Sequence, residues 1–147
     1  MKVEYRDLRL KQLTSALAVF DGTKQTPRPQ RGWLYSIRQA LGMSRQQVAS
    51  AMRVKQQSIV DFENAEANYR ITLRNLCRVA DAMSCELVYA IVPKSGTIVD
   101  LAEKRARDEA NKRVRSVEHT MGLEDQASGN VDEAIAEETK RILKRKK

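Results

Sequence analysis

Gln56, Gln57 and Ser58 are three consecutive polar side chains whose chemistry suits the recognition of DNA bases. A glutamine amide can bond N6 and N7 of adenine at the same time, and a serine hydroxyl can bond several bases. The preceding residue, Lys55, is of a type that contacts phosphate. These side chains need a helix whose first turn enters the major groove. We therefore predict a base-reading turn at residues 56–58.

The surrounding stretch, Gly42–Asn64, predicts two short helices joined by a tight turn. Ser44 is typical of a helix N-cap, and Gln47 three residues later can complete a capping box. Ala49 is small enough to lie where two helices cross steeply. The apolar spacing is that of the bacterial and phage helix-turn-helix, and its other members are Val54, Ile59 and Phe62.

Arg53 stands at the turn position that often holds glycine in this motif. Glycine adopts positive φ without steric strain, whereas other residues do so rarely. Two alternatives follow from the sequence. Either Arg53 accepts a positive φ, or the turn has a somewhat different geometry.

The charge distribution indicates a polyanionic partner for the motif. The formal net charge is +8, and residues 1–96 hold 15 Lys and Arg against 8 Asp and Glu, whereas residues 97–147 hold 12 against 11. No acid occurs from Gly22 to Val60, a stretch that includes Arg28, Arg31 and Arg38. Such an excess can neutralise phosphates, and we expect Arg45 to clamp one. The predicted phosphate contacts are Ser44, Arg45, Gln46, Arg53, Lys55, Tyr69, Arg70 and Thr72.

Four parts are expected along the chain, and the fold class is mainly α. Residues 1–30 form an amphipathic helix, which packs on the core or on a second subunit, and a linker that contains proline. Residues 31–84 form the helix-turn-helix domain, residues 85–96 a dimerisation strand, and residues 97–147 a charged helical extension. The extension has too few apolar residues for a core of its own, so we expect a partner to order it; a solvated tail is the alternative.

The apolar run from residue 86 to residue 92 favours a strand, with a helix as the alternative. Because we predict no other strand, its ladder groups should pair with a second copy of the chain. The expected dimer strand consists of Glu86, Leu87, Val88, Tyr89, Ala90, Ile91 and Val92.

Val54–Asn64 (VKQQSIVDFEN) resembles the recognition segment of the lambdoid phage repressors. The resemblance implies that Gln56 and Gln57 read bases and that Glu63 is structural. Three longer segments, GWLYSIRQALGMSRQQVA, ITLRNLCRVADAM and CELVYAIVPK, resemble the family called mobile mystery protein A. This second resemblance implies a lambda-repressor-like protein encoded on mobile elements beside a Fic-domain protein.

The implied role is an antitoxin-like dimeric autorepressor of a toxin–antitoxin-type operon, which binds a palindromic operator and restrains a Fic-domain toxin. Thr120 and Glu124 come near the motif of Fic-inhibiting helices, although Asp125 departs from it. The alternative is a plain phage or mobile-element repressor without a toxin-neutralising role. We expect no enzyme, cofactor or metal, because the sequence has one His and no catalytic or zinc motif. Reduced cysteines and the absence of a membrane or targeting segment indicate a cytoplasmic protein.

Overall fold

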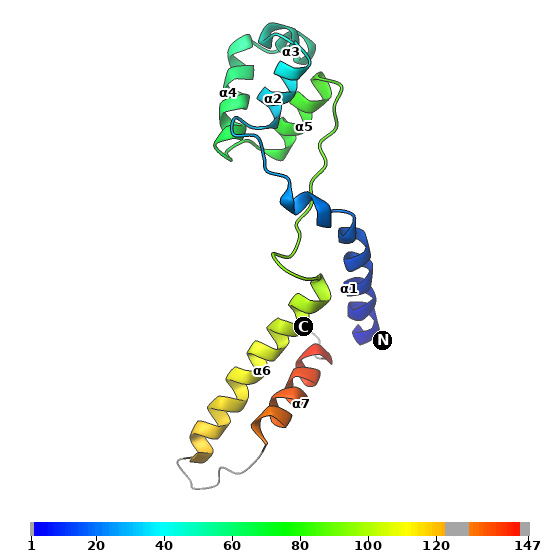
Figure 1. The fold of residues 1–147 in the computed structure, drawn as a ribbon, viewed down its shortest axis with the longest axis vertical. Helices are drawn as coiled ribbons and strands as arrows, with labels where there is room; N and C mark the ends of the chain where they lie inside the picture. Colours follow the sequence, from blue (N-terminus) through cyan, green and yellow to red (C-terminus); the bar gives the residue numbers. More distant parts are fainter. Residues whose placement is uncertain (1, 123–129, 145–147) are drawn as a thin grey trace. The chain divides into compact units, whose positions relative to one another are not determined.

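The computed structural model describes residues 2–122 and 130–144, and every regular element in these ranges is helical, which confirms the predicted mainly α class. The chain divides into two compact units. One is Gly22–Ala90, and the other consists of the two segments that precede and follow it in the sequence. The elements, shown in Figure 1, are α1 (Lys2–Ala18), the 3-10 helix η1 (Asp21–Gln25), α2 (Trp33–Ala40), α3 (Arg45–Met52), α4 (Gln56–Ala67), α5 (Leu73–Ala82), α6 (Ile98–Gly122) and α7 (Val131–Lys144).

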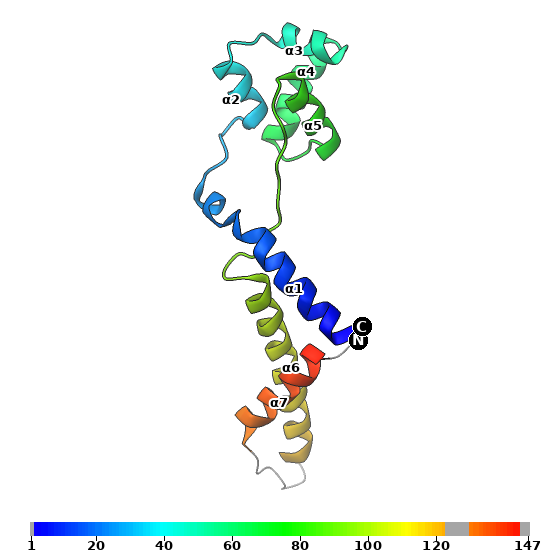
Figure 2. The ribbon, with the colours of Figure 1, turned by 90° about the vertical axis from the view of Figure 1, so that its right-hand side faces the viewer.

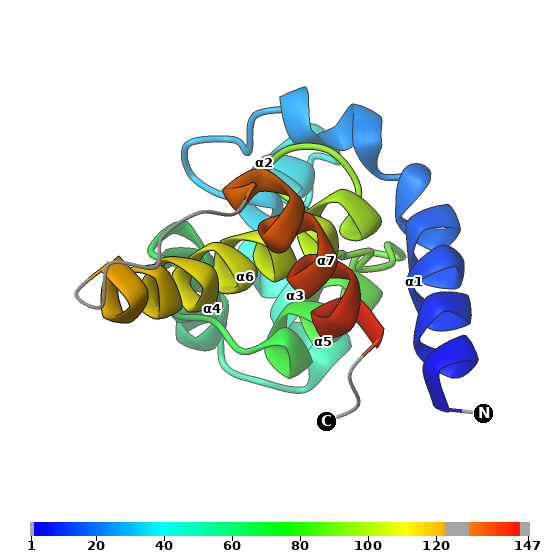
Figure 3. The same ribbon diagram turned by 90° about the horizontal axis from the view of Figure 1, so that it is seen from below.

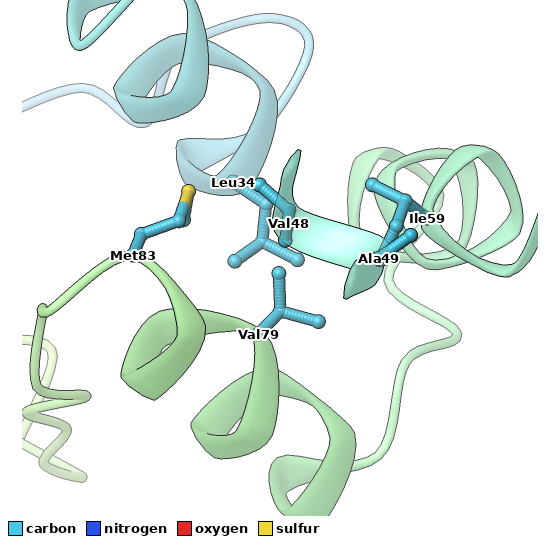
Figure 4. Packing of buried hydrophobic residues seen from close by; sticks show 6 residues of the cluster. All are labelled: Leu34, Val48, Ala49, Ile59, Val79 and Met83. Carbon is cyan, nitrogen blue, oxygen red and sulfur yellow. The ribbon is translucent and has the colours of Figure 1, made fainter. Parts of the chain in front are cut away.

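The unit Gly22–Ala90 is built on one small apolar core to which α2, α3, α4 and α5 contribute. Ala49 is fully buried in α3, which packs against both α4 and α5, so the predicted small residue lies at the crossing of α3 and α4. Figure 4 shows Ala49 beside Ile59, and Val48 close to Leu34 and Val79. The core side chains are Leu34, Val48, Ala49, Ile59, Val79 and Met83.

The start of α2 is fixed by a carboxylate from the far end of α4. The backbone N–H groups of Trp33 and Leu34 each donate to a Glu66 carboxylate oxygen over 2.8 Å. These bonds satisfy two N–H groups that the first turn of a helix leaves without partners, and a negative charge suits the helix dipole. Gly32 permits this approach because its φ is +84° and an added Cβ would lie 2.6 Å from Glu66 Oε2.

The second unit contains α1, α6 and α7, and the views in Figures 1 and 2 agree that α7 runs alongside α6. Ala106 and Ala110 of α6 are 4% and 0% exposed, because small side chains allow close approach. Arg113 of α6 also donates to Glu138 of α7 over 3.0 Å. Helices α6 and α7 therefore pack on each other within this unit, while ordering of the extension by a partner stays a prediction. Among the described helices, none is both long and apolar enough to cross a bilayer.

The strand expected at residues 86–92 is absent from the described chain. Residues 85–93 take neither strand nor helix conformation in the single chain, so the helical alternative is wrong and pairing with a second copy stays a prediction. A strand is defined by the ladder that it forms with a neighbour, and no other described segment of this chain supplies one. Val88, Tyr89 and Ile91 are consequently 68%, 65% and 86% exposed.

Candidate nucleic-acid interface

The turn between α3 and α4 uses a left-handed residue. Arg53 has φ +56° and ψ +42°, and its N–H and that of Val54 close the end of α3 on carbonyl oxygens of the helix. Arg53 therefore accepts a positive φ, which is the first of the two alternatives that the sequence left open. This conformation causes some steric strain for arginine, whereas glycine adopts it without strain. After this turn α4 packs against α3.

The first turn of α4 carries the three residues predicted to read bases. Gln56 and Gln57 are exposed and Ser58 is half-buried, so the two amide side chains are accessible. Lys55 is the N-cap, with extended backbone and no capping bond from its side chain, and it too is exposed. Helix α4 therefore presents four consecutive polar residues at its N-terminal end.

Asp61 joins these residues, although it is not among the residues predicted from the sequence. Its Oδ1 accepts a hydrogen bond of 3.0 Å from Nε2 of Gln57, and both side chains are exposed. Residues four apart lie on the same helix face, so the spacing from Gln57 to Asp61 was the available signal. The exposed polar surface of α4 thus includes a carboxylate.

The N-terminus of α3 has the predicted capping box. The N–H of Gln47 donates to Ser44 Oγ over 3.1 Å, and the N–H of Ser44 donates to Gln47 Oε1 over 2.7 Å. The backbone N–H groups of Arg45 and Gln46 have no acceptor within the helix, as is general for a first turn. This end of α3 has the N–H geometry and dipole that suit a phosphate oxygen.

Arg45 belongs to a charged triad rather than standing alone. Its Nε donates to Oε2 of Glu63 over 3.1 Å, while Nε of Arg38 donates to Oε1 of Glu63 over 2.5 Å. Glu63 and Arg38 are 4% and 5% exposed, whereas the Arg45 side chain is 33% exposed. Arg38 is therefore a buried counter-ion and does not contribute to a phosphate-binding surface. Arg45 keeps contact with solvent and is held in one orientation by Glu63.

The segment after α4 carries the remaining predicted contacts. Thr72 caps α5, because its hydroxyl accepts from the N–H of Asn75 over 3.2 Å. Arg70 is exposed, and Tyr69 is 81% exposed with φ +57°. The tyrosine is engaged by Arg28, whose guanidinium lies 4.1 Å from the ring centroid and donates to the hydroxyl over 3.2 Å.

Arg28 also closes the C-terminus of α4. Its two terminal nitrogens donate to the carbonyl oxygens of Glu66 and Ala67 over 3.1 and 3.2 Å. The Glu66 carbonyl also accepts from the N–H of Tyr69. A cation at this end adds donors to carbonyls of the last turn and suits the negative pole of the helix dipole. The Pro-containing linker is therefore attached to α4, a contact that was not predicted from the sequence.

The residues predicted to inhibit a toxin lie elsewhere. Thr120 is exposed on α6, outside the unit Gly22–Ala90, and its hydroxyl donates to the carbonyl of Ser116 over 3.1 Å. Glu124 and Asp125 lie outside the described residues. Figure 3 gives a view from below in which α6, the helix that carries Thr120, can be followed along its length.

Comparison with known proteins supports the reading of the central unit. Residues 34–89 match the model of a family described as helix-turn-helix, which spans α2 to α5 and part of the following segment. This region is a helix-turn-helix domain of the Xre type, a class of regulators that bind DNA and are typically not enzymes. Neither the comparison with curated proteins nor that with solved structures gives a match.

Proposed function

We propose that the protein is a sequence-specific transcriptional repressor that binds a palindromic operator as a dimer. The observation that carries this proposal is the exposed polar turn of α4 within a domain of the DNA-binding class. In such a domain the second helix of the motif enters the major groove and its first turn meets the base edges. Gln56, Gln57 and Ser58 are the proposed base contacts.

The backbone of the DNA would be held on both sides of this turn. The N-terminus of α3 offers unpaired N–H groups and the oriented guanidinium of Arg45. The proposed phosphate contacts are Ser44, Arg45, Gln46, Arg53, Lys55, Tyr69, Arg70 and Thr72. Thr72 would act through the N-terminus of α5, the helix that it caps. Tyr69 would contact phosphate together with the Arg28 guanidinium that is stacked on its ring.

Residues 85–96 are the proposed dimerisation segment. The exposed side chains of Val88, Tyr89 and Ile91 support it, because an apolar segment without regular structure can pair with its copy and bury them. Two domains joined in this way would read half-sites about one helical turn apart. Sedimentation of the full chain tests the pairing: the wild type should be a dimer, and Ile91→Asp should shift it to monomer. A monomeric wild type would refute this part.

The resemblance to mobile mystery protein A supports a finer role. In that role the protein is a cytoplasmic antitoxin-like autorepressor whose residues 97–147 bind and restrain a Fic-domain toxin. A plain phage or mobile-element repressor is the alternative. Co-expression with the protein encoded by the neighbouring gene separates them, since an antitoxin would form a complex and suppress toxicity. If a Thr120→Ala, Glu124→Ala double variant still suppressed toxicity normally, those two residues would have no part in inhibiting the toxin.

Selection of binding sites from randomised duplex DNA tests the DNA-binding role. The full chain should enrich one palindromic sequence, and Gln57→Ala should flatten the preference at one base position of each half-site while retaining affinity for phosphates. Gln12→Ala, which removes an exposed glutamine from α1 outside the domain, is the matched control and should change nothing. An unchanged preference in Gln57→Ala would show that α4 is not the reading helix.

A further inference from the structure

Asp61 introduces negative charge into a surface that is otherwise basic. It is the first acid after the acid-free stretch Gly22–Val60, and it is exposed on α4 one turn beyond Gln57. The hydrogen bond that it accepts comes from the neutral amide of Gln57, which does not cancel its charge. A carboxylate in a groove lined by phosphates weakens binding to all DNA unless a base donates to it. An acid here therefore needs an explanation in terms of base recognition.

The bond between Gln57 and Asp61 also decides which atoms the pair offers. An ionised carboxylate only accepts hydrogen bonds, so the amide nitrogen of Gln57 must face Asp61. This fixes the orientation of the amide, which a free glutamine leaves open. Gln57 Oε1, one remaining N–H of Gln57 and the second oxygen of Asp61 stay available. Most of these available atoms therefore accept hydrogen bonds rather than donate them.

We infer that Gln57 and Asp61 act as one reading unit that selects bases carrying an exocyclic amino group in the major groove. These bases are cytosine, through its N4 amino group, and adenine, through its N6 amino group; guanine presents only acceptors there. The inference rests on the proposed DNA-binding function and deepens it. Asp61 both orients the Gln57 amide and determines specificity by accepting from the base next to the one that Gln57 contacts.

A structural role for the pair gives a different expectation. A glutamine and an aspartate four residues apart stabilise a helix only slightly. The thermal midpoint of an Asp61 variant should therefore stay close to that of the wild type. If Asp61 contributed only to helix stability, an Asp61 variant would keep the base preference of the wild type. The measured base preference therefore separates a structural role from a role in base recognition.

Site selection with the full-length protein and its Asp61→Ala and Asp61→Asn variants tests the inference. In the wild type, cytosine or adenine should be preferred over guanine by roughly 5- to 140-fold at the position next to the Gln57 contact, the range expected for one good base contact. Asp61→Ala should abolish this preference and raise affinity for unrelated DNA. Asp61→Asn adds an N–H donor, so it should newly admit guanine or thymine there.

Asp81→Asn is the matched control, because Asp81 is an exposed acid at the C-terminal end of α5, the end opposite its Thr72 cap. It removes the same charge from the domain and should leave the profile unchanged. If both Asp61 variants had the same base preference as the wild type, the inference would be overturned. The proposed function would remain intact in that case, provided that Gln57→Ala still flattens the preference. A wild type without any preference would instead overturn the proposed function itself.

Discussion

Replacing Glu63 by glutamine should strongly destabilise the helix-turn-helix domain. The substitution keeps the shape of the side chain but removes the charge that balances Arg38, which is 5% exposed. Two of the bonds from Arg38 end on Glu63, at 2.5 and 3.3 Å, and a third reaches the carbonyl of Met43 at 3.0 Å. Leaving a buried charge unpaired costs about 3–5 kcal/mol. For a domain of this size that corresponds to a fall in Tm of roughly 12–40 °C.

Trp33 gives a direct assay, because it is the one tryptophan of the chain and lies in the domain, next to Glu66. Its fluorescence during urea unfolding should show a midpoint much lower than that of the wild type. Asp81→Asn removes the charge of an exposed acid in the same unit, outside the proposed dimerisation segment, and should alter the free energy of unfolding by less than about 0.5 kcal/mol.

A double variant separates the unpaired charge from other effects. Arg38→Met with Glu63→Leu removes both buried charges, so it should recover most of the stability that Glu63→Gln loses. Arg45 loses its partner as well, but its side chain is 33% exposed and water can solvate it. A loss below about 1 kcal/mol in Glu63→Gln, or a double variant no more stable than that single variant, would refute the reasoning.

Three further changes probe other contacts. Gly32→Ala should lower the free energy of unfolding by about 2–4 kcal/mol in the Trp33 assay, because φ is +84° and the new Cβ would strike Glu66; an unchanged midpoint would contradict the close contact. Ser44→Ala removes the N-cap of α3 and should cost about 1 kcal/mol in the same assay, whereas no loss would show the capping box to be unimportant. Hydrogen bonds from Thr97 hold the pKa of Asp100 below its ordinary value of 3.8. The stabilisation from Asp100 is therefore complete above pH 3.8 and disappears as the pH falls through the lowered pKa. Circular dichroism should show less helix in Asp100→Asn than in the wild type at pH 6, and the difference should narrow toward pH 2; a difference independent of pH would contradict this.

The helix ends could be predicted from sequence because their signals are local. Ser44 and Gln47 are three residues apart and form the expected capping box, and Thr72, of a residue type that favours the N-cap, caps α5. The turn at Arg53 was reduced to two alternatives, since sequence shows the unusual residue but not its φ. Burial of Ala49 followed from the helix-turn-helix spacing.

The contacts that the sequence did not predict join residues far apart in the chain. Glu63 lies 18 residues from Arg45 and 25 from Arg38, and Arg28 lies 38 residues from Glu66. Charge counting treated Arg28 and Arg38 as part of a general basic excess, because it contains no information on which cations are buried or already paired. Composition was misleading for α6 as well, since alanines count little toward a core but permit close helix packing.

The attachment of Arg28 to α4 has a mechanical consequence. Because Arg28 binds the carbonyl oxygens of Glu66 and Ala67, tension that reaches residue 28 is transmitted to the last turn of α4. Glu66 in turn bonds the N-terminus of α2, so the load is shared between the two helices rather than unravelling α2 from its end. A pull that reaches Arg28 would thus act on α4, the helix that we propose to read DNA.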